Sequence, residues 1–284
     1  RFALHSAKLK GKNKFLMFSR EEYEKYVRKI DIQEGLRVSI NNGFEGFLLY
    51  YQPIYGLDKE TVLGAEALIR WDSKKYGFMS PNDFIPLLEE SALIIPLGRW
   101  IIRKAAQQCE KWCRFFPDFV MHINLSFVQV IKSNIVKDIL SGIKFSGLEH
   151  NHFVFEVTES GEMDSSNVVH NVLQDIHNNN FVLAIDDFGT GYSNMRYIKD
   201  MMFGIIKIDR AFITNINENT KNYILVKSII EMIHGLGLRV CVEGVETADE
   251  LTTVQTLKPD TIQGFYYGKP MQEKEFEKKF LRTR

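Results

Sequence analysis

Short runs of consecutive apolar residues alternate with amphipathic stretches over most of the chain. Apolar runs of strand length lie at 119–125, 153–158, 182–186, 204–208, 239–242 and 260–265. Between them, apolar residues recur at helical spacing, as at Val168, Val169, Val172, Leu173 and Ile176 and again at Ile224, Leu225, Ile229, Ile230 and Ile233. This pattern predicts a parallel sheet that is covered by helices, as in α/β proteins.

A hairpin and a helical region precede the repeating part of the chain. The strand-like stretches 47–51 and 62–69 flank a turn at 56–59 and predict a β-hairpin. From Ser80 and Pro81, which are typical of a helix start, a long helical region is expected to about Phe116. Asn124, Glu156 and Asp186 then recur at intervals of 32 and 30 residues, about one strand–helix unit, which favours closure into a β/α barrel.

The first 40 residues carry a different pattern, which indicates material ahead of the barrel. A basic segment at 8–14 and an apolar segment at 15–18 predict a short helix and a strand. Residues 21–40 predict a connecting helix and then the first helix of the main domain, with room for a break near Gly35. We therefore expect three parts, at 1–19, 20–34 (a linker helix) and 35–284 (the barrel). Because Arg1 stands in place of an initiator Met, we expect a piece of a longer protein.

Length and charge narrow the class of protein. The 284 residues fit two average domains, or one β/α barrel of roughly 250 residues with a short appendage. Lys plus Arg and Asp plus Glu both number 36, so no overall field attracts a nucleic-acid polymer or an anionic membrane.

Hydropathy and cysteine content indicate the cellular compartment of the protein. No stretch of 18 or more apolar residues occurs, so we expect no membrane contact within this chain, although an anchor could lie upstream. The three cysteines match neither a disulfide framework nor a zinc site. We expect them to be reduced packing residues of a cytoplasmic protein.

Polar residues occur where the apolar strands end. They are Glu66, Asn124, Glu156, Glu159, Asp186, Asp187, Lys207, Asp209, Glu243 and Gln263. The C-terminal ends of barrel strands open on one face, so these side chains are expected to converge on one pocket.

Each of these residues alone has an ordinary structural explanation. Asp186 and Asp187 could form a helix-capping turn with the residues that follow. Asn124 could also cap a helix, and Lys207 could extend to the surface. The whole set is harder to explain this way, because several carboxylates at the ends of buried strands repel one another unless cations offset their charge.

The ligand types indicate which cations would suit such a pocket. Carboxylates and one amide oxygen, without His or Cys at the strand ends, favour Mg²⁺, Mn²⁺ or Ca²⁺ over zinc or copper. His122, two residues before Asn124, is interpreted as a core residue or one that supports the ligands from behind. The adjacent Asp186 and Asp187 could serve two ions, an arrangement that suits in-line attack on a phosphodiester.

Eight motifs in order resemble the EAL family of cyclic-di-GMP phosphodiesterases over nearly all of residues 35–271. They are Tyr51-Gln52-Pro53-Ile54, Glu66-Ala67-Leu68-Ile69-Arg70-Trp71, Ile123-Asn124-Leu125-Ser126, Phe155-Glu156-Val157-Thr158-Glu159-Ser160, the stretch 186–191, Ile206-Lys207-Ile208-Asp209-Arg210, Val242-Glu243-Gly244-Val245-Glu246-Thr247 and Gln263-Gly264-Phe265. A lone Glu-Ala-Leu would carry little weight, whereas the ordered set is highly specific. The resemblance implies an α/β fold, a modified TIM-type (β/α)8 barrel with an N-terminal β-hairpin and a short N-terminal helical extension.

The resemblance also implies a reaction. One phosphodiester bond of cyclic di-GMP would be hydrolysed to linear pGpG by water activated on two Mg²⁺ or Mn²⁺ ions, and Ca²⁺ would inhibit. The implied metal ligands are Glu66, Asn124, Glu156, Asp186 (bridging), Asp187 and Glu243. The implied catalytic residues are Lys207, Glu66, Asp186, Asp187 and Glu159, and the implied substrate contacts and pocket residues are Gln52, Leu68, Arg70, Asp209, Glu246 and Gln263.

Individual roles follow from the same resemblance. Lys207 would orient or deprotonate the attacking water and offset charge in the transition state, and Asp209 would hold Lys207 in place. Glu159 would anchor the segment after Asp187, and a homodimer is expected through the helix and loop of that segment. Residues 3–18 resemble the last helix and strand of a GGDEF domain, so 1–19 is expected to be the remnant of one.

Two other classes of function remain open. A barrel of this kind could bind cyclic di-GMP without cutting it and act as a receptor, or it could be a scaffold with a degraded pocket. Loss of a metal ligand, of Lys207 or of Glu159 would favour the receptor, but all are present. Val242 replaces the alanine of many relatives and the ending at 265–269 varies, but neither departure removes a ligand.

Overall fold

A computed structural model describes residues 19–57, 61–159, 167–189 and 202–281. The chain forms two compact units, one of Arg1–Phe47 with Trp71–Leu93, the other of Leu48–Arg70 with Ile94–Arg284. The two units are described separately below. Residues 3–18, which resemble a GGDEF remnant, and most of the expected dimer segment after Asp187 lie outside the described residues.

The larger unit is built on a closed sheet. Its strands are β1 (Phe47–Gly56), β2 (Thr61–Ser73), β4 (Val120–Asn124), β5 (Phe153–Thr158), β6 (Val182–Phe188), β7 (Ile205–Ile208), β8 (Arg239–Val242) and β9 (Thr261–Gln263). They pair in the order β1-β9-β8-β7-β6-β5-β4-β2, and β1 also pairs with β2, so the ring closes. β1 runs antiparallel to β9, whereas β2 and β4–β9 are mutually parallel. The predicted modified barrel with its N-terminal hairpin is therefore confirmed.

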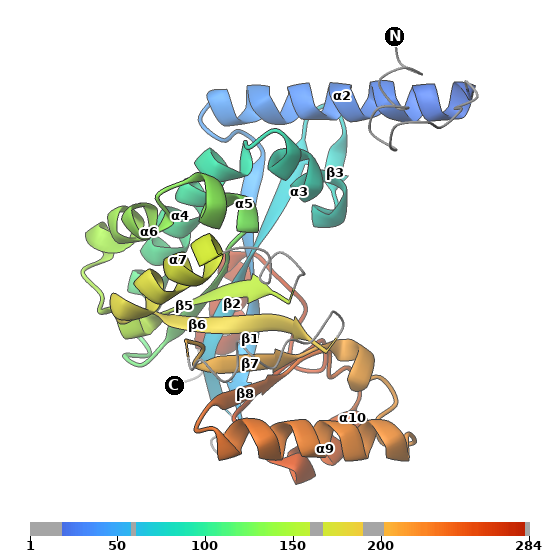
Figure 1. Cartoon of the computed structure of the whole chain (residues 1–284), viewed down its shortest axis with the longest axis vertical. Coiled ribbons are helices and arrows are strands. Elements are labelled where there is room, and N and C mark those ends of the chain that lie inside the picture. The colour runs from blue at the N-terminus through green and yellow to red at the C-terminus, as the bar shows by residue number, and fades with distance from the viewer. Residues whose placement is uncertain (1–18, 58–60, 160–166, 190–201, 282–284) are drawn as a thin grey trace. The chain divides into compact units, whose positions relative to one another are not determined.

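Helices between successive strands cover the outside of the sheet (Figure 1), and one more helix, α11 (Glu273–Phe276), follows the last strand. The helices between strands are α4 (Ile94–Cys113), α5 (Phe127–Lys132), α6 (Ile135–Ile143), α7 (Asn167–Asn178), α9 (Thr220–Gly235) and α10 (Ala248–Leu257). Short helical turns at η1 (Lys144–Ser146), η2 (His150–His152), η3 (Arg210–Phe212) and η4 (Glu277–Leu281) complete the connections.

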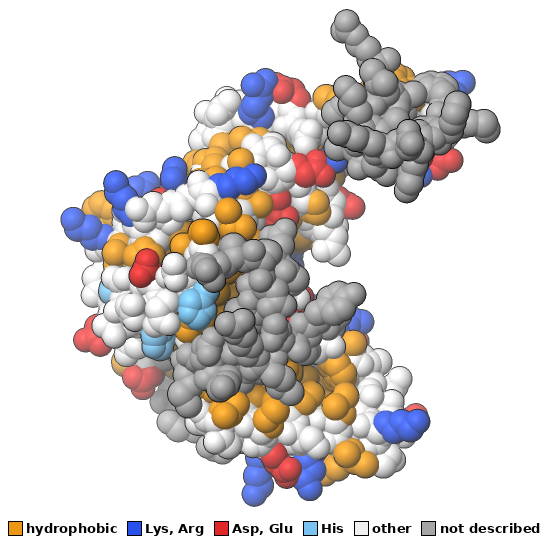
Figure 2. All heavy atoms as spheres, in the orientation of Figure 1, with side chains coloured by type: hydrophobic (Ala, Val, Ile, Leu, Met, Phe, Trp, Pro, Cys, Tyr) orange, Lys and Arg blue, Asp and Glu red, His pale blue; other side chains and the backbone are white. Residues whose placement is uncertain are grey.

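The predicted apolar face of α9 is partly wrong. Val226, Ile230 and Ile233 are the buried residues of this helix, whereas Ile224 and Leu225 are 58% and 44% exposed. Hydrophobic side chains are accordingly visible on the surface over α9 (Figure 2). The sequence pattern could not decide between the two faces, because apolar residues occupy positions on both.

The inside of the barrel is layered. Val154, Ala184, Ile205 and Cys241 form a buried apolar cluster, against which Val120 and Val182 pack. Each cluster member stands two residues before a polar residue of the same strand or its end, and side chains two apart in a strand point the same way. The polar residues therefore stand on an apolar floor.

The smaller unit contains α2 (Arg20–Asn41), α3 (Pro81–Glu90) and β3 (Gly77–Met79), which pairs with the end of β2. α2 continues through Gly35 without a break. A Cβ at Gly35 would lie 2.9 Å from Cε2 of Tyr76, so this glycine allows a ring to pack closely on the helix.

The long helical region expected from Ser80 to about Phe116 is present but is divided into two helices, because α3 ends at Glu90 and α4 begins at Ile94. Ala92 between them has a φ of +56°, which no α-helix accommodates. None of the helices in the described ranges is long and apolar enough to cross a membrane.

Candidate active site

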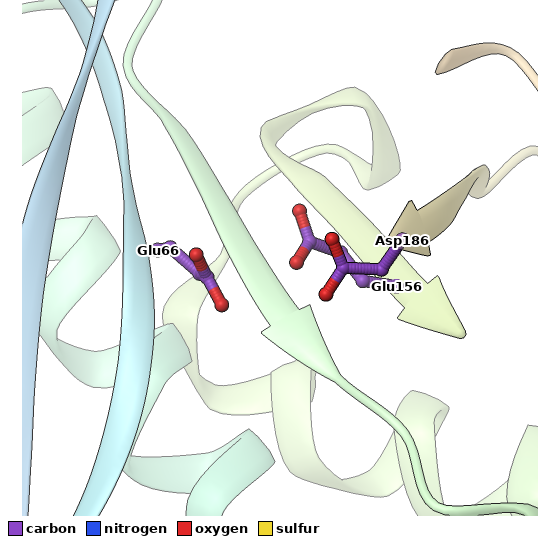
Figure 3. A group of neighbouring side chains, drawn as sticks. All are labelled: Glu66, Glu156 and Asp186. Carbon is purple, nitrogen blue, oxygen red and sulfur yellow. The ribbon is translucent and has the colours of Figure 1, made fainter. Parts of the chain in front are cut away.

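The polar strand-end residues of the larger unit meet at one mouth of the barrel. Glu66 lies on β2, Asn124 on β4, Glu156 on β5, Asp186 and Asp187 on β6, Lys207 on β7 and Gln263 on β9, and Glu243 directly follows β8. Figure 3 shows the carboxylates of Glu66, Glu156 and Asp186 turned toward one another from separate strands. The parallel strands bring these residues together because their C-terminal ends share one edge.

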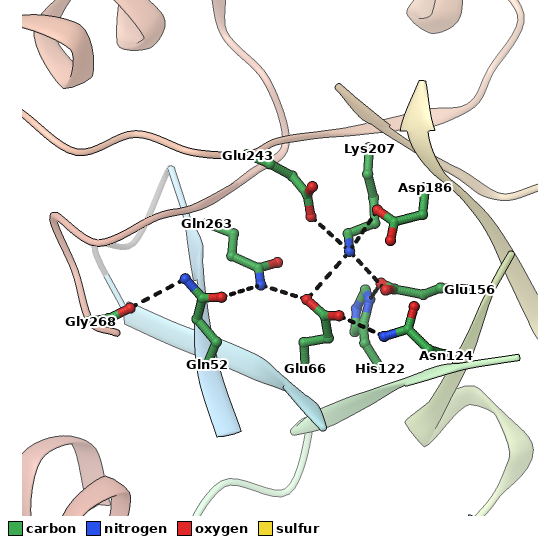
Figure 4. A network of polar contacts seen from close by, with 10 residues as sticks. All are labelled: Gln52, Glu66, His122, Asn124, Glu156, Asp186, Lys207, Glu243, Gln263 and Gly268. Carbon is green, nitrogen blue, oxygen red and sulfur yellow. Dashed lines mark hydrogen bonds and ion pairs between the residues drawn. The ribbon is translucent and has the colours of Figure 1, made fainter. Parts of the chain in front are cut away.

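Lys207 stands at the centre of this group (Figure 4). Its Nζ lies 2.7 Å from Glu156 Oε2, 2.7 Å from Glu243 Oε1, 3.1 Å from Asp186 Oδ1 and 3.5 Å from Glu66 Oε2. The Lys207 side chain is 1% exposed. It therefore does not extend to the surface, and its ammonium is the shared partner of four carboxylates.

Burial and charge shift the pKa values of these groups in opposite directions. Burial alone would lower the pKa of Lys207, but the surrounding carboxylates outweigh it and hold that pKa well above its usual value. Burial raises the pKa of Glu156 and of Glu243 well above the usual value, although Lys207 opposes the shift. Glu66 differs, because Lys207 and the amides of Gln263 and Asn124 together outweigh burial and lower its pKa.

Among the residues that the structure describes, two groups of carboxylates have the geometry to hold a cation. Oxygens of Glu66, Glu156 and Asp186 lie within 4.8 Å of one another, and so do oxygens of Asp186, Asp187 and Glu243. Asp186 belongs to both groups, which places it between two neighbouring candidate positions. Oxygen ligands of this kind suit hard divalent cations.

Asp187 owes its position to an irregularity in β6. The register with β7 shifts between Ile185 and Phe188, and Asp187 has a φ of +54°. Burial, the charge of Asp186 and the charge of Asp209 raise the pKa of Asp187 to about 6. The irregularity directs two adjacent carboxylates to one site, which a regular strand would send to opposite faces.

A chain of amides orients Glu66 from the other side. Gln263 Nε2 donates to Glu66 Oε2 at 2.7 Å and also contacts Gln52 Oε1 at 3.1 Å. Gln52 Nε2 in turn donates to the carbonyl of Gly268 at 3.3 Å, and Asn124 Nδ2 donates to Glu66 Oε1 at 2.6 Å. Since the nitrogen of Asn124 is the donor, its amide oxygen is the atom that can ligate a cation.

Glu159 connects the ends of β5 and β6. Its backbone N–H donates to the carbonyl of Asp186 at 3.0 Å, and its Oε2 accepts from the N–H of Gly189 at 2.7 Å. Gly189 has a φ of +97°, a conformation that favours glycine. The carboxylate thus holds the backbone just after Asp187.

The mouth of the barrel forms a pocket of about 220 Å³ above these residues. Its lining consists of Gln52, Glu66, Leu68, Asp186, Asp187, Asp209, Arg210, Glu243, Gly244, Glu246, Gln263, Gly264 and Phe265. Arg70 is not among them, and its guanidinium lies 5.5 Å from the centre of the Tyr50 ring. Asn124, Glu156 and Lys207 likewise do not line the pocket, although they contact residues that do.

Comparison with known proteins identifies the family. The model of the EAL domain family matches residues 33–270. This chain belongs to the EAL domain family. The motifs quoted from the sequence thus mark a true EAL domain, and its barrel is the fold of that family.

Solved EAL domains share this fold closely. The EAL enzyme Bd1971, in a form with cAMP and cyclic di-GMP bound, matches with a TM-score of 0.83 and 32% identity over 89% of this chain and 69% of its own. The PaMucR phosphodiesterase in a c-di-GMP complex matches with a TM-score of 0.80 and 30% identity over 87% of this chain and 99% of its own.

A curated relative of this EAL domain is the cyclic di-GMP phosphodiesterase PdeR of Escherichia coli strain K12. It is 31% identical over 283 residues, which are 99% of this chain and 42% of PdeR. Against three further curated relatives, the chain spans only 34–39% of their length.

The structure adds Arg210 and Phe265 to this EAL domain's site and gives His122, expected in the core or behind the ligands, a specific partner. Arg210 and Phe265 line the pocket, and their signal in the sequence was adjacency to Asp209 and to the Gln263-Gly264 pair. His122 lies below the pocket, with Nδ1 2.6 Å from Glu156 Oε1 and only 7% of its side chain exposed. Burial and the charge of Lys207 lower the pKa of His122 to about 3, so the imidazole is neutral at physiological pH.

Proposed function

We propose that this EAL domain hydrolyses one phosphodiester bond of cyclic di-GMP to linear pGpG. The observation that carries the proposal is the pair of carboxylate groups that share Asp186 around the ammonium of Lys207. The relatives support it, because PdeR is named a cyclic di-GMP phosphodiesterase and the PaMucR phosphodiesterase was solved with c-di-GMP.

The charge of the pocket indicates why divalent cations are needed. Six carboxylates line it (Glu66, Asp186, Asp187, Asp209, Glu243 and Glu246), against the single guanidinium of Arg210. An anionic dinucleotide would be repelled from such a surface unless cations offset the charge. We propose that Glu66, Asn124, Glu156, Asp186, Asp187 and Glu243 would hold two ions, Mg²⁺ or Mn²⁺, with Asp186 common to both groups of ligands.

In the proposed reaction, residues of the chain bind the ions, orient the attacking water and hold the backbone at the pocket. Two divalent ions, when bound, would lower the pKa of water and neutralise phosphate charge. The Lys207 ammonium presents N–H donors at the centre of the carboxylates, where it can orient the attacking water or stabilise charge on the reacting phosphate. Glu159 holds the backbone after Asp187, which keeps that carboxylate at the pocket.

Substrate contacts are proposed from the lining. Gln52, Gln263 and Leu68 offer amide and apolar contacts to the dinucleotide, and Glu246 and Asp209 lie at the rim beside Arg210. We assign Arg70 to a phosphate of the substrate, for which its guanidinium would move from the Tyr50 ring toward the mouth.

A hydrolysis assay tests the proposed function. The purified protein is incubated with cyclic di-GMP and Mg²⁺ or Mn²⁺, with EDTA as the control, and the products are separated by chromatography. We expect linear pGpG only when the metal is present. Tight binding of cyclic di-GMP without any cleavage under either metal would contradict the enzyme and support the receptor instead.

A homodimer is proposed as the assembly of this domain, on the resemblance to the family alone. Light scattering during gel filtration measures the mass in solution, for which we expect about twice the 33.0 kDa of the chain. A monomeric mass in the presence of metal and substrate would overturn this assignment.

A further inference from the structure

His122 is a polar side chain within the apolar interior of the barrel. It precedes Asn124 by two positions on β4, so both side chains face inward. Across the sheet it is in register with Val154 of the floor on one side and with Glu66 on the other. A buried imidazole in such surroundings is costly unless it is hydrogen-bonded.

Glu156 is the partner that satisfies His122. The two oxygens of this fully buried carboxylate have different partners, because Oε1 lies 2.6 Å from His122 Nδ1 and Oε2 lies 2.7 Å from Lys207 Nζ. Figure 4 shows both contacts converging on Glu156. The carboxylate is therefore held at both ends, and its plane is fixed.

The two partners differ in the group that they bring to Glu156. Lys207 brings an ammonium, which occupies Oε2 on the side of the other carboxylates. His122 brings a ring nitrogen, which can satisfy Oε1 by a hydrogen bond from the opposite end of the carboxylate. A donor of this kind orients a ligand and raises its basicity, as outer partners of metal ligands do in general.

We propose that His122 is a positioning residue of this site: its Nδ1–H donates to Glu156 Oε1 and so aims Oε2 at the cation. The inference rests on the proposed function, since it assumes that Glu156 is a metal ligand. His122 does not line the pocket and would act through Glu156 without contact with the substrate.

Three substitutions separate positioning from packing. His122→Leu keeps a similar volume but removes the donor. His122→Asn keeps an N–H near the place of Nδ1, whereas His122→Gln moves the amide toward the place of Nε2. The readouts are the Kd of Mn²⁺ alone by titration calorimetry, the thermal unfolding temperature without metal, and kcat and KM for cyclic di-GMP.

Positioning predicts a specific order of metal affinities. We expect His122→Leu and His122→Gln to bind Mn²⁺ about 10- to 100-fold more weakly, and His122→Asn to recover most of the wild-type affinity. At saturating Mn²⁺, kcat should fall in Leu and Gln variants while KM stays within about threefold of the wild type.

Unchanged Mn²⁺ affinity in His122→Leu would overturn the proposal, even if that variant unfolds at a lower temperature, because packing alone would then explain His122. If His122→Leu does not fold, equal affinities of the Asn and Gln variants would overturn it as well. The calorimetric measurement needs no turnover. Absence of hydrolysis by the wild-type protein would therefore count against the proposed function and leave the role of His122 to the Mn²⁺ affinities.

Discussion

Asp187 combines backbone strain with an unfavourable charge. Its φ of +54° lies in the left-handed region, which aspartate tolerates better than most residues but still at a cost. Its carboxylate lies beside those of Asp186 and Asp209, which together with burial raise its pKa to about 6. Strain and repulsion at one residue are typical of a site that is complete only when a ligand binds.

The raised pKa of Asp187 predicts a pH dependence of stability. Because the pKa is about 6 in the fold, whereas the usual value for aspartate is 3.8, the metal-free protein gains stability from protonation of Asp187. That gain is complete below about 3.8 and is lost as the pH rises through about 6. Asp187→Asn removes this loss, so without metal the variant should become more stable relative to the wild type between pH 4 and pH 7.

Urea unfolding in EDTA, repeated across this pH range, measures the difference between Asp187→Asn and the wild type. With saturating Mn²⁺ at pH 7.5 the order should reverse, because the variant lacks a proposed ligand. A stability difference that does not change with pH would show that Asp187 does not titrate as described.

The strand-end carboxylates and a supporting place for His122 could be predicted from the sequence, but the contact of His122 with Glu156 could not. Glu156 and Asp186 stand at the ends of apolar runs, and a barrel fold alone implies that such ends converge. The contact of His122 with Glu156 depends on the register that pairs Asn124 of β4 with Glu156 of β5. A one-residue change in register alters which side chains meet, and no apolar pattern reports it for strands buried on both faces.

At the scale of elements, the approach of β2 to β4 depends on Gly64. A Cβ at Gly64 would lie 2.2 Å from the carbonyl oxygen of Val120, its partner in the parallel register. Gly64 precedes Glu66 by two residues, so the same backbone that approaches β4 also positions a proposed metal ligand.

Gly64→Ala should therefore impair both stability and turnover. Separation of β2 and β4 is expected to destabilise the fold by about 1–3 kcal/mol and to lower kcat through displacement of Glu66. Gly235→Ala, at the end of α9 where a new Cβ meets nothing within 4 Å, is the matched control.

The control should stabilise the protein by about 0.5–1 kcal/mol and leave kcat unchanged. Denaturant midpoints and initial rates of pGpG formation measure the two effects. Equal rates for the two variants would mean that the spacing of β2 and β4 does not control Glu66.

Helices and strands were predicted well where a clear sequence signal marks them and poorly where the signal for a boundary is missing. The strand runs 153–158 and 239–242 coincide with β5 and β8, because short apolar runs between helices have few alternatives. The break between α3 and α4 was not predicted, because residues 91–93 contain no glycine or proline and the left-handed Ala92 leaves no trace in periodicity.

At the scale of the whole molecule, the barrel contains a lysine that serves as counter-ion to its clustered carboxylates. The chain has no net charge, yet four carboxylates are concentrated around the buried Lys207. In the absence of metal, the ammonium of Lys207 lies within 3.5 Å of an oxygen of each and limits repulsion among them. The stability of the metal-free fold and the proposed chemistry of the site would therefore depend on the same residue.

Lys207→Met should separate the contribution of Lys207 to stability from its proposed contribution to hydrolysis. Without metal, loss of the ammonium leaves buried carboxylates uncompensated, and we expect destabilisation by about 3–5 kcal/mol. Saturating Mn²⁺ should restore much of that stability, since the ions offset the same charge, while hydrolysis stays at least about 100-fold below the wild type.

Lys227→Met, which removes an exposed lysine of α9 that lies 3.9 Å from Glu231, is the control and should change stability by less than about 1 kcal/mol. Unfolding in EDTA and in Mn²⁺ measures both variants. A loss in Lys207→Met that is the same with and without Mn²⁺ would argue against a shared role as counter-ion.

The apolar floor formed by Val154, Ala184, Ile205 and Cys241 lies inside the barrel, below the polar strand-end residues. Water, ions, dinucleotide and linear product would then enter and leave the proposed site through the same mouth of the barrel. Product that dissociates slowly would therefore block binding of the next substrate molecule. For the proposed reaction, the rate at which cyclic di-GMP is removed would thus depend on the rate of product release as well as on the rate of bond cleavage.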